Sequence, residues 1–128
     1  MKAHVKRICD SAELTPANSV RFEIGLAQSR YGLVPLEGFA VRTGDGVARG
    51  YHNICPHRGQ PVDLGDGKLR AADGLLECQA HGAYFDPSSG VCLRGPCPGR
   101  SLRPLELREE SGALWLDERT VEPVPDPD

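Results

Sequence analysis

The apolar residues of this chain alternate with polar ones in short runs, which is the pattern of half-buried β-strands. In Val20–Leu26 an apolar side chain stands at every second position, with polar residues or glycine between. Phe39–Val41 precedes the turn-forming Thr43–Gly46, and Val47–Tyr51 continues beyond it. The two runs that flank this turn predict a β-hairpin.

A second hairpin is predicted near the end of the sequence. Apolar and polar residues alternate in Leu105–Arg108, Glu110–Gly112 supplies a turn, and Leu114–Leu116 returns. Asp10–Leu14 can cap one helical turn, which Pro16 would end. The chain has 15 glycines and 11 prolines, which favour many turns and few long helices. We therefore expect a mostly β protein with an antiparallel base.

The length of 128 residues fits one domain, which we place at residues 1–117. Residues 118–128 are acidic and rich in proline, with too little apolar content to pack, and are predicted to form a mobile tail. No run of 18 apolar residues and no apolar signal core occurs, so we expect a cytoplasmic protein away from the membrane. The net charge of -3 disfavours a nucleic-acid partner.

The candidate chemistry lies in two short runs, Cys55-Pro56-His57-Arg58-Gly59 and Cys78-Gln79-Ala80-His81-Gly82. Each run brings one cysteine and one histidine together, and each ends in a glycine that lets the backbone approach a bound centre closely. Two thiolates and two imidazoles from two loops predict a mixed-ligand metal site.

The spacing separates two kinds of metal site. A structural zinc site usually spaces its ligand pairs C-x2-4-C and H-x3-5-H, which a C-x-H pair fits poorly. In the Rieske type of [2Fe–2S] centre, two thiolates hold one iron and two imidazoles hold the other. The order C-x-H followed by C-x2-H resembles the signature of the Rieske family. A zinc-stabilised interaction module without a redox role stays as an alternative from a different class.

The resemblance extends from about Tyr51 to Pro104. His81–Asp86 and Ser88–Gly90 resemble the second ligand loop and the hairpin after it, and Gly95-Pro96 stands where the family has a third, proline-containing loop. One departure is the 20-residue separation of His57 from Cys78, whose surplus we place in loop-forming residues 63–68. The resemblance implies an antiparallel β-sandwich base with a small cluster-binding subdomain at about residues 51–104.

The same resemblance implies the roles of the ligands. Cys55 and Cys78 would hold one iron of a single [2Fe–2S] cluster, and His57 and His81 would hold the other. Because thiolates stabilise ferric iron more strongly than neutral imidazoles do, the added electron should settle on the histidine side. Four further residues are expected to form an exposed rim through which electrons leave: Arg58, Gln79, Ala83 and Pro96.

The function implied is that of a soluble one-electron carrier between a reductase and a terminal oxygenase, as in the ferredoxins of ring-hydroxylating dioxygenases. No glycine-rich phosphate loop is found, so flavin or nicotinamide chemistry would come from the reductase. A terminal oxygenase would need a further iron domain with two histidines and a carboxylate, and only His4 and His52 remain for it. We therefore expect no enzyme activity of its own. The small Rieske subunit of a nitrite-reductase-like enzyme is the alternative within the family.

The reduction potential is expected to lie low in the family range. High-potential members carry a serine hydroxyl two residues after the second histidine ligand and a tyrosine hydroxyl two further on, and hydrogen bonds to the cluster sulfurs raise the potential. Ala83 and Phe85 occupy these positions and cannot donate such bonds. The hydroxyl of Tyr84 should point to the opposite face of its strand.

The remaining cysteines are Cys9, Cys92 and Cys97. We expect reduced thiols, some of them in the core, because an intracellular protein seldom keeps disulfides; a Cys92–Cys97 bridge is the alternative. The disulfide that joins the ligand loops of the respiratory Rieske proteins has no counterpart, since Gln60 and Ala80 stand at those positions. His4 and His52 are given no role.

Overall fold

The structure of the chain is a computed structural model that describes residues 5–15, 18–29, 32–53, 74–78, 82–95 and 100–118. Among these residues the chain forms strands and one short 3-10 helix, and every strand pair is antiparallel. The predicted fold class, mostly β with antiparallel sheets, is confirmed. The elements are β1 Val5–Asp10, η1 Ser11–Glu13, β2 Ser19–Ser29, β3 Gly32–Arg42, β4 Ala48–His52, β5 Leu76–Glu77, β6 Tyr84–Phe85, β7 Cys92–Arg94, β8 Pro104–Leu105, β9 Leu107–Glu110 and β10 Ala113–Asp117.

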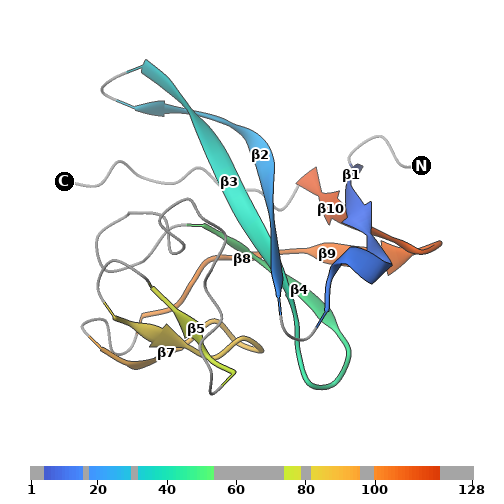
Figure 1. Ribbon diagram of the computed structural model, residues 1–128. Helices are drawn as coiled ribbons and strands as arrows, with labels where there is room; N and C mark the ends of the chain where they lie inside the picture. Colours follow the sequence, from blue (N-terminus) through green and yellow to red (C-terminus); the bar gives the residue numbers. More distant parts are fainter. Residues whose placement is uncertain are drawn as a thin grey trace.

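The strands form three sheets (Figure 1). The central sheet has the order β2-β3-β4-β8, and the long β2 and β3 extend beyond the rest of it as a hairpin. A sheet of order β1-β10-β9 lies on one side, and the small sheet β5-β6-β7 lies on the other. We call the first two sheets the base and the small sheet, with the residues that pack on it, the subdomain.

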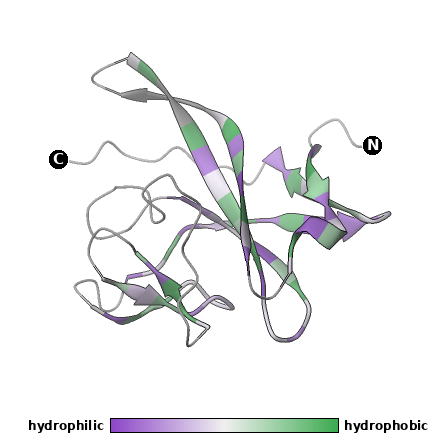
Figure 2. Ribbon diagram, in the orientation of Figure 1, coloured by the Kyte–Doolittle hydropathy of each residue, from purple (hydrophilic) through white to green (hydrophobic). Residues whose placement is uncertain are grey.

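Residues Phe39–Val41 of β3 are buried on both faces of the strand, because the base packs on one face and the subdomain on the other. Phe39, Ala40 and Val41 are consecutive and all fully buried. Side chains of neighbouring strand residues point to opposite faces, so Phe39 and Val41 face one layer and Ala40 faces the other. In Figure 2, β3 shows a purple, hydrophilic segment between green, hydrophobic ones.

Two hydrophobic cores lie on the two sides of the central sheet. The core of the base joins residues of β2 and β3 to residues of β1 and β10, so two antiparallel sheets pack face to face as a sandwich. Its buried members are Cys9, Leu14, Phe22, Ile24, Leu36, Ala40, Leu105, Leu114 and Leu116. The core of the subdomain contains Phe39, Val41, Tyr51, Leu76, Cys78, Ala83, Phe85, Cys92 and Leu102.

Both predicted hairpins are present. Strands β3 and β4 pair through the turn at Thr43–Gly46, where the Gly46 N–H donates to the Thr43 carbonyl at 2.9 Å. Strands β9 and β10 pair through Ser111 and Gly112. One assignment was wrong: Leu105 does not continue into β9 but lies in β8, opposite Gly50 of β4. The alternating run is therefore divided between two sheets.

The predicted helical turn is the 3-10 helix η1, in which the Asp10 N–H donates to a Glu13 carboxylate oxygen at 2.7 Å. The helix ends at Glu13, three residues before Pro16. The structure adds two features that the pattern did not predict: strand β1, and the continuation of the β2–β3 hairpin to Gly32. No helix among the described residues is long and apolar enough to span a membrane. The predicted tail lies outside the described residues except for Glu118.

Candidate metal centre

Of the four predicted ligands, only Cys78 lies within the described residues; Cys55, His57 and His81 lie outside them. Cys78 directly follows β5 and is fully buried. Its N–H donates to the Ala83 carbonyl at 2.7 Å, and its own carbonyl accepts from the Gly82 N–H at 2.9 Å. These two bonds hold Cys78 and Gly82, the two ends of the predicted second ligand loop, close together.

Two glycines make this turn and its packing possible. Gly82 has a φ of 70° and Gly95 a φ of 103°, which are left-handed conformations that favour glycine. A Cβ atom on Gly95 would lie 2.7 Å from the Ala83 Cα and 2.9 Å from the Gly82 carbonyl oxygen. The chain at Gly95 therefore packs directly on the second ligand loop. The predicted third loop begins here, although Pro96 lies outside the described residues.

The prediction that Ala83 is part of an exposed rim was wrong. Ala83 is fully buried, because its carbonyl is bonded to Cys78 and its Cα is covered by Gly95. The other predicted rim residues, Arg58, Gln79 and Pro96, lie outside the described residues.

Strand β6 places its two aromatic residues on opposite faces, as predicted. Phe85 is fully buried in the subdomain core. Tyr84 is partly exposed, and the guanidinium carbon of Arg94 lies 4.5 Å from the centroid of its ring. The Tyr84 hydroxyl therefore belongs to the outer face of the small sheet.

The first ligand loop, Cys55–Gly59, follows a fixed stretch of backbone. The His52 N–H donates to the Arg103 carbonyl at 2.9 Å, and the Asn53 N–H donates to the Glu37 carbonyl at 2.8 Å. His52, to which no role was given, is a buried residue at the end of β4. The two bonds fix the direction in which β4 leads toward the loop.

Tyr51 connects β4 to the turn between β6 and β7. Its hydroxyl donates to the Pro87 carbonyl at 2.9 Å. Burial raises the pKa of Tyr51 to about 12, so the hydroxyl keeps its proton and this bond at neutral pH. The subdomain is thereby held on the central sheet by a polar contact as well as by its apolar core.

The cysteines that were not predicted as ligands are buried thiols where the structure describes them. Cys92 lies in the subdomain core, and its Sγ donates to the Arg94 carbonyl at 3.3 Å. Cys9 lies in the core of the base, where burial raises the pKa of its thiol. Neither is in a disulfide, as predicted. Cys97 lies outside the described residues.

The site that these residues form fits an iron–sulfur centre. Cys78 offers a soft thiolate ligand, it is shielded from water, and a turn built on glycine lies directly beside it. Within the described ranges no group of three or more histidine, cysteine, aspartate or glutamate side chains could hold a metal by itself. A centre at Cys78 therefore needs ligands from the adjoining loops.

The family described as Rieske [2Fe-2S] domain matches residues 4–114. The chain belongs to the Rieske family. Its cofactor is accordingly one [2Fe–2S] cluster, and its chemistry is the carrying of single electrons. This finding sets the zinc-stabilised module aside. No curated protein sequence matches the chain.

Solved structures of Rieske proteins share the fold. The ferredoxin of carbazole 1,9a-dioxygenase from Nocardioides aromaticivorans IC177 superposes with a TM-score of 0.64 at 21% identity, over 89% of this chain and 97% of the ferredoxin. A chain from the complex of reduced oxygenase and oxidized ferredoxin in carbazole 1,9a-dioxygenase gives 0.62 at 22% identity, over 90% and 94%. The terminal oxygenase of carbazole 1,9a-dioxygenase from Novosphingobium sp. KA1 gives 0.64 at 22% identity, over 98% of this chain and 31% of the oxygenase.

The structure also brings forward a residue that sequence reasoning missed. Gly95 was noted only for its place before Pro96, yet its left-handed backbone is what lets it pack on the second ligand loop.

Proposed function

We propose that this chain is a Rieske-type ferredoxin, a carrier of single electrons that turns over no substrate itself. The observation that carries the proposal is the fully buried Cys78 thiol, held between a core and a pair of glycine-dependent backbone segments. The ferredoxin of carbazole 1,9a-dioxygenase supports the proposal, because 97% of its chain superposes on this chain.

We further propose that Cys55 and Cys78 are the thiolate ligands and that His57 and His81 are the imidazole ligands. When bound, the cluster supplies reversible one-electron chemistry. The burial of Cys78 keeps water from its sulfur, and the bonds between Cys78, Gly82 and Ala83 fix the direction of the second ligand loop. The bonds of His52 and Asn53 do the same for the backbone that leads to the first loop.

The proposed partners are a flavin-dependent reductase that supplies electrons and a terminal oxygenase that receives them. The complex of reduced oxygenase and oxidized ferredoxin in carbazole 1,9a-dioxygenase supports this pairing, because its ferredoxin has the fold of this chain. Such partners would be met in the cytoplasm.

We propose a potential in the low part of the Rieske range, which runs from about −150 to +300 mV. Ala83 and Phe85 are both fully buried in the core that contains Cys78, and their side chains carry no hydrogen-bond donor. A hydroxyl at either position should stabilise the reduced state by about 1 to 3 kcal/mol and raise the potential by about 40 to 130 mV. Redox titration of Ala83→Ser and Phe85→Tyr checks this. A wild-type midpoint well above about +100 mV, in the upper part of the range, would contradict it.

The cofactor is tested by composition and spectroscopy. Protein purified without oxygen should contain about two irons and two acid-labile sulfides per chain, and its reduced form should give an electron paramagnetic resonance signal. Stoichiometric zinc without iron would overturn the proposal.

The carrier role is tested by reconstitution. The protein should restore product formation by a carbazole 1,9a-dioxygenase whose own ferredoxin has been omitted, and Cys78→Ser should not. A wild-type protein that has its cluster and reductase-dependent reduction, yet passes no electron to an oxygenase, would contradict the assigned partner while leaving the cluster in place.

A further inference from the structure

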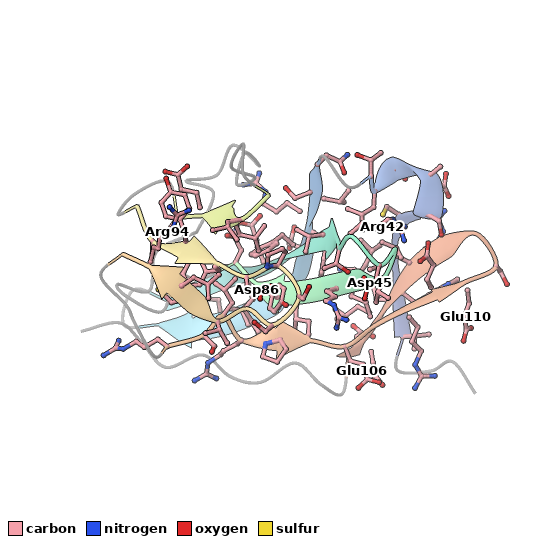
Figure 3. The ribbon with its side chains drawn as sticks, turned by 90° about the horizontal axis from the view of Figure 1, so that it is seen from below. Arg42, Asp45, Asp86, Arg94, Glu106 and Glu110 are labelled. Atoms are coloured by element: carbon pink, nitrogen blue, oxygen red, sulfur yellow. The ribbon has the colours of Figure 1, made fainter. Side chains whose placement is uncertain are left out.

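The side chain of Tyr51 bonds the central sheet to the subdomain. Tyr51 belongs to β4, is 3% exposed, and donates its hydroxyl to the Pro87 carbonyl at 2.9 Å. Pro87 lies in the turn of residues 86–90, which connects β6 to β7. In Figure 3 Asp86, where this turn begins, lies near the middle of the molecule, while Arg94 at the end of β7 lies toward one side. The turn therefore meets the central sheet at Tyr51.

The ring of Tyr51 is held as closely as its hydroxyl. Its centroid lies 5.9 Å from the centroid of the Phe39 ring, and a Cβ atom on Gly90 would lie 2.8 Å from one of its carbons. Gly90 also has a φ of 78°, so glycine meets the demand for a left-handed backbone as well as for the close approach. Packing and the hydrogen bond together fix the position of the hydroxyl.

Both partners of this bond lie a few residues from a predicted ligand loop. Cys55 stands four residues after Tyr51 in the sequence. The turn with Pro87 follows the two-residue strand β6, and Ala83, directly before β6, accepts from the Cys78 N–H at 2.7 Å. The bond of Tyr51 thus joins the backbone that leads into the first loop to the backbone that leads out of the second.

Residues 100–105 make a second link between the same two regions. The Leu102 N–H donates to the Gly90 carbonyl at 2.8 Å, which ties this segment to the turn. Two residues later, Pro104 pairs with Tyr51 across β8 and β4, which ties the segment to the central sheet. A unit held by one link can rotate about it, whereas two separate links fix its orientation. The apolar core adds attraction, but the hydrophobic effect has no direction of its own.

We propose that Tyr51 is a positioning residue, whose hydrogen bond to Pro87 fixes the second ligand loop relative to the first. The proposal rests on the proposed function, because it takes the cluster ligands to come from these two loops. Groups that orient the ligands of a metal centre change both its retention and its reduction potential. The placement of the loops should therefore influence both properties of the cluster.

Tyr51→Phe tests this role because it removes the hydroxyl and keeps the ring that packs on Phe39 and Gly90. Iron should pass to a chelator about threefold to tenfold faster than in the wild type. The redox equilibrium constant against a reference dye should change at least about threefold in either direction, which equals about 28 mV for a one-electron centre. Chelator assays and redox titration measure the two effects.

Thr43→Val is the matched control. Thr43 is also 3% exposed, and its hydroxyl bonds to Asp45 and to the Val47 carbonyl in the turn that leads into β4. Iron release and the redox equilibrium constant should stay within about twofold of the wild type, since these bonds share no partner with the turn of residues 86–90. Denaturant unfolding compares the stability of the two variants.

Two outcomes of this comparison count against the positioning role. One is a Tyr51→Phe protein whose iron release and potential match those of the wild type. The other is an equal change of both quantities in Thr43→Val, because a general loss of stability would then explain the effect.

Hydrogen exchange reports on the second loop without electron transfer. Tyr51→Phe should speed exchange of the bonded N–H groups of Cys78 and Gly82 about threefold to tenfold. The Ser11 N–H, which donates to the Gly112 carbonyl at 2.8 Å in the base, should exchange as in the wild type. Equal acceleration at the three sites, or none at Cys78 and Gly82, would overturn the proposal.

The measurements distinguish this proposal from the proposed function. A chain that holds no iron would remove the proposed function, and exchange at Cys78 and Gly82 would still test the link from Tyr51. A cluster that is present and unchanged in Tyr51→Phe would leave the proposed function in place and remove the positioning role alone.

Discussion

The base and the subdomain have hydrophobic cores of similar size, but their strands differ greatly in length. The base is built on strands of up to 11 residues, and its two sheets enclose one core. The subdomain has strands of two or three residues around a comparable set of buried side chains. Short strands supply few ladder hydrogen bonds, so the subdomain depends more on its loops and on whatever those loops bind. We therefore expect the cofactor to stabilise the subdomain much more than the base.

The largest expected effect is the loss of a ligand. Cys78→Ser should abolish the cluster, because serine replaces a thiolate ligand poorly, and the subdomain should loosen with it. Amides of β2 and β10 should keep their protection in hydrogen exchange, since the core of the base does not contain Cys78.

Cys92→Ser is the control for that variant. Cys92 is buried in the same core, and serine could keep the hydrogen bond to the Arg94 carbonyl. Iron content should therefore stay near the wild-type value. Equal loss of iron in both variants would show that burial, and not ligation, explains the effect.

The second effect compares the two cores. Leu114→Ala in the base and Leu76→Ala in the subdomain each remove a fully buried side chain and should each cost about 2 to 5 kcal/mol. The loss at Leu114 should lower the free energy of global unfolding, while the loss at Leu76 should mainly open the subdomain and speed the release of iron. Denaturant unfolding measures the free energy of global unfolding, and the rate of iron release measures the opening of the subdomain. Matching profiles for both variants would show that the regions unfold as one unit.

The third effect compares two glycines with left-handed backbones. Gly95→Ala adds a Cβ that would meet the second ligand loop and should cost about 2 to 4 kcal/mol, with weaker retention of iron. Gly112→Ala, in the turn between β9 and β10, has no neighbour within 4 Å and should cost only about 1 to 2 kcal/mol, with iron unaffected. Thermal unfolding and iron analysis distinguish the two.

The smallest effect concerns the ion pair between Arg42 and Glu109 in the base. Arg42 donates to both carboxylate oxygens of Glu109 at 2.9 Å, and its other bonds reach the carbonyls of Leu14 and Gly46. The hydrogen bond from Arg42 lowers the pKa of Glu109. A lowered pKa stabilises the fold above the pKa of the unfolded chain, near 4.3, and this contribution disappears as the pH falls through the folded value.

Glu109→Gln should therefore cost about 1 kcal/mol at pH 7, a small value because the carboxylate is about one-third exposed. The difference from the wild type should shrink below about pH 4. Unfolding curves at several pH values check this, and a difference that grows in acid would contradict it. Iron content should not change.

The sequence was sufficient to predict the features that depend on local order. The turns at Thr43–Gly46 and Glu110–Gly112 are made by residues with strong turn preferences, and the strands beside them alternate clearly. The ligand loops are likewise predicted from local order, because the spacings C-x-H and C-x2-H each bring a cysteine and a histidine together in one short loop. The family match confirms the predicted [2Fe–2S] cofactor, and Cys78 is the one predicted ligand whose surroundings the structure describes.

Strands in which apolar and polar residues do not alternate were not predicted from the sequence. The β2–β3 hairpin shifts register between Glu23 and Gly25 and continues through Pro35, so its distal half shows no clean period of two. Strand β1 is six residues long, with only Cys9 fully buried, and it forms because β10 pairs with it. Such features depend on partners far away in the chain.

What the sequence by itself determined is therefore the list of elements and the chemistry that their loops can carry. Only the tertiary structure decided that residues Phe39–Val41 of β3 are buried on both faces and that Ala83 lies inside and not on the rim. The physical reason is that alternation reports which residues avoid water, while the surface that covers each of them is supplied by strands distant in sequence.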